Sequence, residues 1–287
     1  MSTILQCPVC RNPLIPSTGG YQCSNKHTFD VARQGYVNLM LAHKKHSKEP
    51  GDSPAMIQSR RRFLDQGFYD RVSDGINEVV AGNLRESENG TAFCILDAGC
   101  GEGFYIKRLK EYLMGRSGGR IILDCYGVDI SKYAVSKAAQ RGKTITWAVA
   151  NIVDLPFTSG SLDIVMNVFA LADFNEFSRI LKEAGKLVIV TPGPRHLNGL
   201  REIIYPVSRE HTQSEMSEQA KGLFTLSTIS RVSYPFELKR AEEIMDLLAM
   251  TPYFWNIDLN TKSKVEALNR LELEVDVVIT VFNKKKE

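Results

Sequence analysis

A glycine-rich turn at residues 99–103 constrains the fold of this chain more strongly than any other sequence feature. The turn follows an apolar run, Phe93 to Leu96, and precedes apolar residues at helical spacing between Phe104 and Leu113. A short strand that passes through glycines into a helix is typical of α/β folds in which the helix N-terminus binds a cofactor. We therefore expect a parallel sheet with a binding site at this turn.

Two acidic residues distinguish this turn from a dinucleotide site. The dinucleotide fingerprint is G-x-G-x-x-G, and it places a pyrophosphate where nearby negative charge is unfavourable. Here Gly99, Gly101 and Gly103 are spaced G-x-G-x-G, with Asp97 before them and Glu102 among them. Such carboxylates favour a ligand that carries an ammonium and a sulfonium, which indicates S-adenosylmethionine. We predict a Rossmann-like class I methyltransferase fold; a purely structural strand-to-helix turn is the alternative.

The next two predicted strands lead to residues that can bind a nucleoside. The run Ile121–Val128 ends at Asp129, whose carboxylate can accept hydrogen bonds from both ribose hydroxyls. After a third strand at residues 144–149, either Asn151 or Ile152 is expected to contact the adenine edge. A plain polar loop is the alternative at that position.

The remaining pattern alternates between strands and helices. A fourth strand over Asp163–Ala170, a helix over Phe174–Lys182 and a fifth strand over Gly185–Val190 predict a doubly wound parallel sheet. Alternating apolar residues between Leu273 and Val281 predict a half-buried edge strand. We expect the insertion from about Leu200 to Pro235 to form part of a lid or an extra pair of strands.

Four residues near the N-terminus have the types and spacing of a metal site, namely Cys7, Cys10, Cys23 and His27. Three thiolates and one imidazole can complete a tetrahedron around zinc, which leaves no open position and makes the site structural. Reduced cysteines without metal are the alternative. We expect one zinc ion, whose loss unfolds the front module but spares cofactor binding in the distant domain.

Length and charge indicate how the chain is divided. The 287 residues suffice for one α/β core and a small module. We place a zinc-binding module at residues 1–48, a helical linker at 49–88 and the methyltransferase domain at 89–287. Residues 1–72 contain ten Lys and Arg against five Asp and Glu, which predicts a polyanionic partner unless this is simply a solvated basic surface.

No apolar run in the sequence approaches the length of a membrane span, and the N-terminus lacks the apolar core of a signal peptide. We expect a cytoplasmic protein that does not bind membranes.

A series of motifs occurs along nearly the whole chain. They are the Cys/His knuckle, Phe29–Ala32 with Gly35–Leu39, Pro50–Ser53, Arg61–Leu64, the glycine turn, Thr191–Leu197 and Met250–Tyr253. In this order they resemble the RrmA-like bacterial 23S rRNA (guanine-N1)-methyltransferase family. Two positions depart from the family pattern. Ala170-Leu171 stands where Ala-Pro is common, and Glu183-Ala184-Gly185 stands where Pro-Gly-Gly is common.

The resemblance implies methylation of a guanine N1 in hairpin 35 of 23S rRNA. It also implies that the zinc module helps to recognise the RNA and that the protein is a homodimer. By motif position it suggests cofactor contacts from Tyr69, Asp97, Gly99, Asp129 and Asn151.

The end of the fourth strand should overlook the methyl group. Guanine N1 carries a proton at neutral pH, so the base must be unpaired, deprotonated and held in line with the methyl group. Asn167 is expected to orient the base edge, Phe169 to stack on it and Asp173 to accept the proton, unless Asp173 only caps the following helix. His196 is the other candidate base, with a more suitable pKa.

Two further functions are compatible with these motifs. One is a methyltransferase that acts on a small molecule or a protein, with zinc serving only structure. The other is a catalytically silent RNA-binding protein that retains the cofactor fold. Detection of methyl transfer, and its dependence on RNA, distinguish the three.

Overall fold

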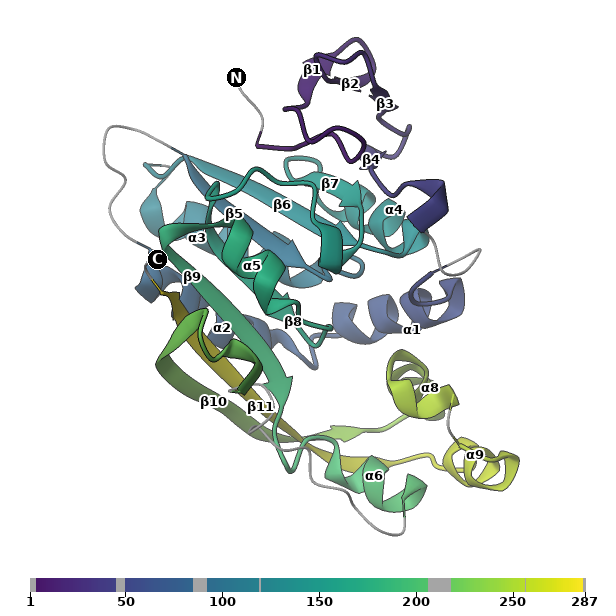
Figure 1. Ribbon diagram of the computed structural model, residues 1–287. Helices are drawn as coiled ribbons and strands as arrows, with labels where there is room; N and C mark the ends of the chain where they lie inside the picture. Colours follow the sequence, from purple (N-terminus) through teal and green to yellow (C-terminus); the bar gives the residue numbers. More distant parts are fainter. Residues whose placement is uncertain are drawn as a thin grey trace.

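The main sheet of the protein has eight strands in the order β10-β11-β9-β8-β5-β6-β7-β4 (Figure 1). This computed structural model describes residues 4–44, 50–84, 92–118, 120–205, 218–255 and 257–285. Neighbouring strands run parallel from β9 to β4, whereas β11 is antiparallel to both β9 and β10. The strand order reverses at β5, so the crevice of a doubly wound sheet lies at the carboxyl ends of β5 and β8.

The strands of the main sheet are β4 (Tyr36–Asn38), β5 (Phe93–Ala98), β6 (Leu123–Asp129), β7 (Thr146–Val149), β8 (Leu162–Val168), β9 (Leu181–Pro192), β10 (Phe224–Leu238) and β11 (Leu271–Lys284). A separate three-stranded sheet near the N-terminus consists of β1 (Ile15–Ser17), β2 (Gly20–Gln22) and β3 (Thr28–Asp30). The expected alternation of strands and helices is therefore confirmed.

The α-helices are α1 (Pro54–Asp65), α2 (Asp70–Asn83), α3 (Phe104–Ser117), α4 (Lys132–Arg141), α5 (Phe174–Ile180), α6 (Asn198–Ile204), α8 (Ala241–Met250) and α9 (Leu259–Glu266). Short 3-10 turns occur at η1 (Ala42–Lys44), η3 (Ile152–Asp154) and η4 (Pro252–Trp255). Within the described residues, no helix combines the length and the apolar character that crossing a membrane requires.

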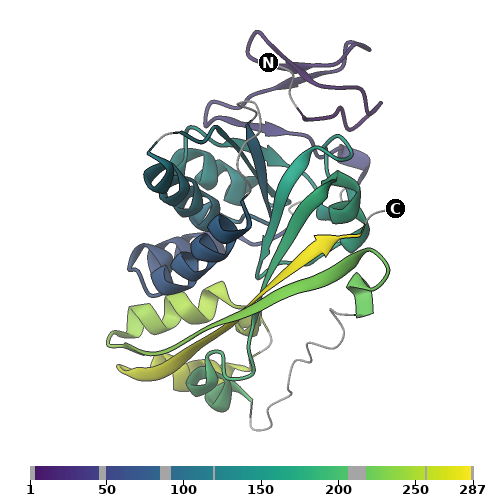
Figure 2. The same cartoon turned by 90° about the vertical axis from the view of Figure 1, so that its left-hand side faces the viewer.

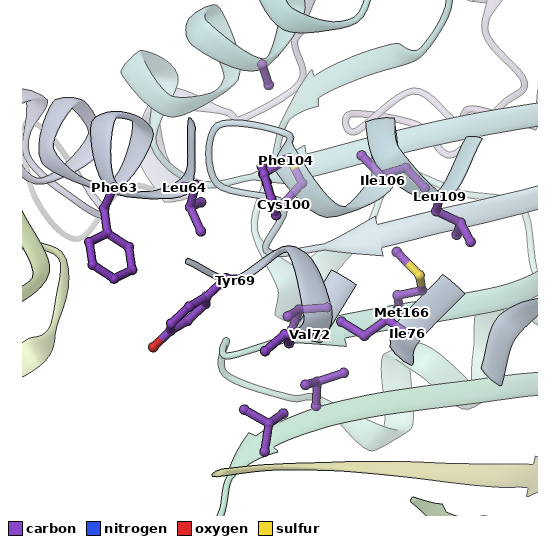
Figure 3. Close-up of a cluster of buried hydrophobic side chains, with 14 of the residues drawn as sticks. Phe63, Leu64, Tyr69, Val72, Ile76, Cys100, Phe104, Ile106, Leu109 and Met166 are labelled. Carbon is purple, nitrogen blue, oxygen red and sulfur yellow. The ribbon is translucent and has the colours of Figure 1, made fainter. Parts of the chain in front are cut away.

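Helices cover both faces of the sheet, which therefore has two apolar layers (Figure 2). Along β5, Ile95 joins the buried cluster that includes residues of α2 and α3, part of which Figure 3 shows. The next residue, Leu96, joins the cluster that includes Phe177 of α5. Because successive side chains of a strand point to opposite faces, both faces of β5 are buried and its sequence is continuously apolar up to Asp97.

The predicted zinc module is attached to the main sheet and is not distant from it. Strand β4 pairs with β7, and Leu5 forms a bridge with Phe157 in the loop after β7. The side chains of Leu5 and Phe157 are both fully buried. The expectation that the cofactor domain lies far from the metal module is therefore wrong.

Strand β11 is not an edge strand, contrary to the sequence prediction. It lies between β9 and β10, and the edge position belongs to β10, which the insertion supplies. Exposed and buried side chains alternate only near the start of β11, whereas residues 275–282 are all buried. The alternation of apolar and polar residues therefore applies only to the start of the strand, and it contains no information on the pairing of β11 with β10.

Candidate functional site

The predicted cofactor residues meet at one edge of the parallel sheet. The glycine turn follows β5, Asp129 ends β6, Asn151 follows β7 and Phe169 follows β8. These are the carboxyl ends of adjacent parallel strands, so residues far apart in sequence converge beside the switch point.

Close packing explains two of the three glycines in the turn. A Cβ atom on Gly99 would lie 2.5 Å from the Cβ of Ala170, in the loop after β8. A Cβ atom on Gly103 would lie 2.6 Å from the ring of Trp147 in β7. Both glycines also have φ of 85°, in the left-handed region that disfavours side chains. The turn therefore holds the ends of β5, β7 and β8 together.

The carboxylate of Asp97 is buried beneath the turn. Its side chain is fully buried, and neither oxygen has a hydrogen-bond partner among the residues that the structure describes. Burial and the nearby negative charge of Asp129 raise the pKa of Asp97 to about 7. A buried acceptor without a partner is costly, so this group suits a cationic ligand such as the ammonium of S-adenosylmethionine.

Glu102 does not face the cofactor site, contrary to our expectation. Its buried carboxylate lies 2.6 Å from the guanidinium of Arg141, which also pairs with Asp65 at 2.8 Å. Burial raises the pKa of Glu102 to about 7, despite the opposing charge of Arg141. This ion pair connects the glycine turn to the end of α4. Among the described residues, one oxygen of Glu102 is also without a hydrogen-bond partner, whereas Asp97 has no partner on either oxygen.

Asp129 is held in a fixed orientation by two main-chain donors. Gly101 N–H donates to its Oδ2 at 2.9 Å, and Ser131 N–H donates to its Oδ1 at 2.8 Å. Burial raises the pKa of Asp129, which the two hydrogen bonds oppose. Each carboxylate oxygen has a further lone pair, so two ribose hydroxyls can still donate to this group.

Arg60 of α1 lies over the glycine turn. A Cβ atom on Gly101 would lie 3.4 Å from Nη1 of Arg60, whose Nη2 pairs with Asp52 at 2.6 Å. The same Nη2 donates to the carbonyl of Met250 at the end of α8, 3.3 Å away. Segments from both ends of the chain therefore meet above the turn.

Asn151 begins the short turn η3. Its Oδ1 accepts a hydrogen bond from Val153 N–H at 3.3 Å. Its neighbour Ile152 lies 3.4 Å from the position that a Cβ of Gly99 would occupy. The same loop contacts the zinc module, because Asp154 pairs with Arg11.

The four predicted metal ligands are brought together as one cluster. Sγ of Cys10 and Sγ of Cys23 are 3.6 Å apart, and His27 Nδ1 lies 3.5 Å from Cys7 Sγ and 3.4 Å from Cys23 Sγ. All four ligand atoms lie within 4.8 Å of one another. Ligands about 2.3 Å from a tetrahedral zinc are separated by roughly 3.8 Å, so this arrangement fits the metal closely.

An aromatic group connects the loop after β8 to the loop after β9. Phe169 stacks on His196 with ring centroids 5.8 Å apart, and it contacts Tyr69 and Tyr105 at 6.4 Å. Phe169 has φ of 52°, an uncommon conformation for a bulky residue, and its side chain is 38% exposed. An exposed aromatic ring in a strained conformation at a strand end is suited to contact a ligand.

His196 is buried, and both of its ring nitrogens have protein partners. Asp276 N–H donates to Nδ1 at 3.2 Å, and Nε2 lies 3.1 Å from the hydroxyl of Tyr69. Burial lowers the pKa of His196 to about 4, so the expected suitability of its pKa for a general base is wrong. Figure 3 shows the Tyr69 hydroxyl pointing away from its neighbours Val72 and Ile76.

Asn167 and Asp173 flank the loop that follows β8. The Nδ2 of buried Asn167 donates to the carbonyls of Ala98 and Leu171, both at 2.9 Å, and thereby fixes this loop against the turn. The Oδ1 of Asp173 accepts from Glu176 N–H at 2.9 Å and caps α5, the structural role that the sequence left open.

Sequence reasoning missed Asp276, a fully buried carboxylate in β11. Its main chain binds His196, and its side chain pairs with Arg231 of β10. Acidic residues at alternate positions of a strand are usually solvent-facing, so the sequence contained no signal that this one is buried.

Comparison with known proteins agrees with both parts of this arrangement. The family model of the RlmA N-terminal zinc ribbon matches residues 5–48, and a methyltransferase-domain model matches residues 96–189. Residues 7–27 of the metal cluster and the glycine turn lie within these two matches.

Relatives match over most of the chain. A 23S rRNA (guanine(748)-N(1))-methyltransferase of Streptomyces fradiae is 34% identical, over 88% of this chain and 86% of that protein. A Bacillus subtilis protein named as a candidate 23S rRNA (guanine-N(1)-)-methyltransferase is 30% identical, over 97% and 96%. A similarly named Micromonospora griseorubida protein is 28% identical over 88% of each chain.

Substitution of Cys10 by Ala should abolish stoichiometric zinc binding, because the remaining three ligands leave the tetrahedron open. Since the module contacts the loop that contains Asn151, we also expect weaker binding of S-adenosylmethionine. Metal analysis and calorimetry measure the two effects. Cys125→Ala, a buried cysteine outside the cluster, is the control and should retain zinc. Wild-type protein without zinc would contradict the assignment.

Asp129→Asn should weaken S-adenosylmethionine binding by about 2 kcal/mol, or roughly 30-fold, because the variant loses a charged acceptor for two hydroxyls. Calorimetry measures the affinity. Asp124→Asn makes the same change on an exposed residue of β6 and should have no effect. Equal affinities of the two variants would place the ribose elsewhere.

Affinity for S-adenosylmethionine should fall as the pH falls from 8 to 6. The pKa of Asp97 is raised to about 7, so its carboxylate is ionised above that pH and loses its attraction for an ammonium below it. The loss should approach tenfold per pH unit below the pKa. Calorimetric titrations at several pH values should show that Asp97→Asn removes this dependence and Asp124→Asn retains it. An unchanged pH dependence in Asp97→Asn would exclude Asp97 as its origin.

Proposed function

The chain belongs to the 23S rRNA (guanine-N1)-methyltransferase family, and on that premise we propose that it methylates N1 of a guanine in hairpin 35 of 23S rRNA. The observation that carries the proposal is the 34% identity to the Streptomyces fradiae enzyme over 86% of its length. That enzyme is named for guanine 748, so we expect the equivalent guanine to be the target.

S-adenosylmethionine supplies the methyl group when it is bound. We assign its ammonium to Asp97, its ribose hydroxyls to Asp129 and its adenine edge to the loop at Asn151. Tyr69 is assigned a further contact with the cofactor. Gly99, Gly101 and Gly103 are assigned main-chain contacts with it, because the space beside Gly99 and Gly103 is filled by Ala170 and Trp147. The unpartnered carboxylate of Asp97 and the oriented carboxylate of Asp129 support these assignments.

We assign the guanine to the loop after β8. The exposed ring of Phe169 can stack on an unpaired base. Leu171, two residues later in the same loop, is 88% exposed. Asn167 fixes the loop through the Leu171 carbonyl, so its amide acts on the base by positioning this loop. The acceptor is a main-chain carbonyl, so Leu171 makes this contact although proline is common at this position in the family.

Asp173 is the proposed acceptor of the guanine N1 proton. Its Oδ1 caps α5, whereas its second oxygen is not required by the cap. His196 is not proposed for this step, because burial lowers its pKa to about 4 and its nitrogens contact Asp276 and Tyr69.

The zinc module is proposed to bind the RNA backbone. Residues 1–72 carry a formal charge of +5, which suits phosphate contacts. An rRNA substrate further supports a cytoplasmic location, and by family resemblance we propose a homodimer. We also propose domain boundaries at residues 48 and 88. Strand β4 belongs to the zinc module by its position in the sequence and to the main sheet by its pairing with β7.

Primer extension on 23S rRNA tests the reaction, because a methyl group on N1 blocks base pairing and stops reverse transcriptase. We expect a stop in hairpin 35 that is lost when the gene is deleted and restored by the wild-type gene. A stop that persists in the deletion strain would refute the assigned reaction.

The same assay tests the proton acceptor. Asp173→Asn keeps a side chain that can cap α5 but lacks the basic carboxylate, so we expect it not to restore the stop. Asp258→Asn makes the same change at the cap of α9 and should restore it fully. Restoration by Asp173→Asn would leave the reaction intact but exclude Asp173 as the acceptor.

A further inference from the structure

Asp276 organises the loop that carries His196. Its main-chain carbonyl accepts from Gly193 N–H at 2.7 Å, and its Oδ2 accepts from Arg195 N–H at 2.9 Å. Its own N–H donates to Nδ1 of His196 at 3.2 Å. A Cβ atom on Gly193 would lie 2.6 Å from the Asp276 carboxylate, so the loop closes tightly around this side chain.

An ion pair from the neighbouring strand holds Asp276 in place. Nε of Arg231 lies 2.5 Å from its Oδ1, and Nη2 of Arg231 lies 2.6 Å from its Oδ2. Burial alone would raise the pKa of Asp276, but Arg231 and the Arg195 N–H hold it below its usual value. The carboxylate is therefore ionised at neutral pH, and this two-pronged geometry fixes its direction.

The hydrogen bond from Asp276 determines which nitrogen of His196 carries the proton. A main-chain N–H can only donate, so Nδ1 must be the unprotonated, accepting nitrogen. The proton of the neutral ring is then on Nε2, which lies 3.1 Å from the hydroxyl oxygen of Tyr69. Because Tyr69 accepts this bond, its own O–H is available to donate to another group.

We infer that Asp276 is a positioning residue that sets the tautomer of His196 and thereby makes the Tyr69 hydroxyl a hydrogen-bond donor toward the bound cofactor. The inference rests on the proposed function, in which Tyr69 contacts S-adenosylmethionine. A donor at this position suits an acceptor such as the carboxylate of the cofactor. The path runs from Arg231 through Asp276 and His196 to Tyr69, and His196 transfers no proton along it.

A double-mutant cycle tests this path by calorimetry with S-adenosylmethionine. Tyr69→Phe and His196→Phe should each weaken binding about tenfold, the effect of one hydrogen bond, because the first removes the donor and the second removes the Nε2–H that orients it. The double variant should bind no more weakly than Tyr69→Phe alone, because both changes remove the same contact. Independent losses that multiply to about a hundredfold would contradict the path and make His196 a purely structural residue.

A spectroscopic measurement does not depend on how the variants fold. Nitrogen NMR of the wild-type protein should show His196 protonated at Nε2 and unprotonated at Nδ1 throughout pH 6 to 8. Asp276→Asn keeps the main-chain donor to Nδ1 and should therefore keep this tautomer. A proton on Nδ1 in the wild type would overturn the inference.

The matched control is Glu274→Gln, which removes a carboxylate two positions earlier in β11. Glu274 pairs with Arg195 at 3.0 Å, and within the described part of the chain its side chain does not hydrogen-bond to the ring of His196, so affinity and tautomer should not change. Wild-type protein that fails to bind S-adenosylmethionine would refute the proposed function. Normal wild-type binding together with unchanged affinity in His196→Phe would refute this inference alone.

Discussion

The contact between the glycine turn and the loop after β8 is the constraint on which the site depends. Gly99 lies directly against Ala170, and no side chain larger than hydrogen fits between them. Asn167 reinforces the same junction by bonding to carbonyls on both sides of it. Because Asp97, the proposed ligand of the ammonium, lies beside the turn and the proposed base contacts lie on the loop, this junction sets the distance between the proposed methyl donor and acceptor sites.

Local chemistry made much of the site predictable. The cysteine and histidine spacing identified four ligands that the fold brings together, and the acidic end of the second strand identified Asp129. Such patterns are readable because each residue is close in sequence to the element that positions it. The other hydrogen-bond partners of such a residue can be main-chain N–H groups, which are present whatever the sequence.

Long-range contacts explain what could not be predicted. The pKa of His196 is lowered by burial, and its partner Asp276 lies 80 positions later in the chain. Glu102 was expected to face the cofactor, but Arg141 from the next helix binds it. In the same way, β11 became an interior strand only because a separate segment supplied β10. Sequence periodicity describes one element at a time and contains no record of these partners.

The position of the last strand has a consequence for the order in which the protein becomes active during its synthesis. Asp276 lies in β11, the final strand, and Met250, which meets Arg60 above the turn, also comes late. During synthesis β4 to β9 and the metal cluster precede these segments, which are still missing when they emerge. His196 then has no Nδ1 donor from Asp276, and the wall above the turn is incomplete. The site is therefore finished only when the last strand has joined the sheet.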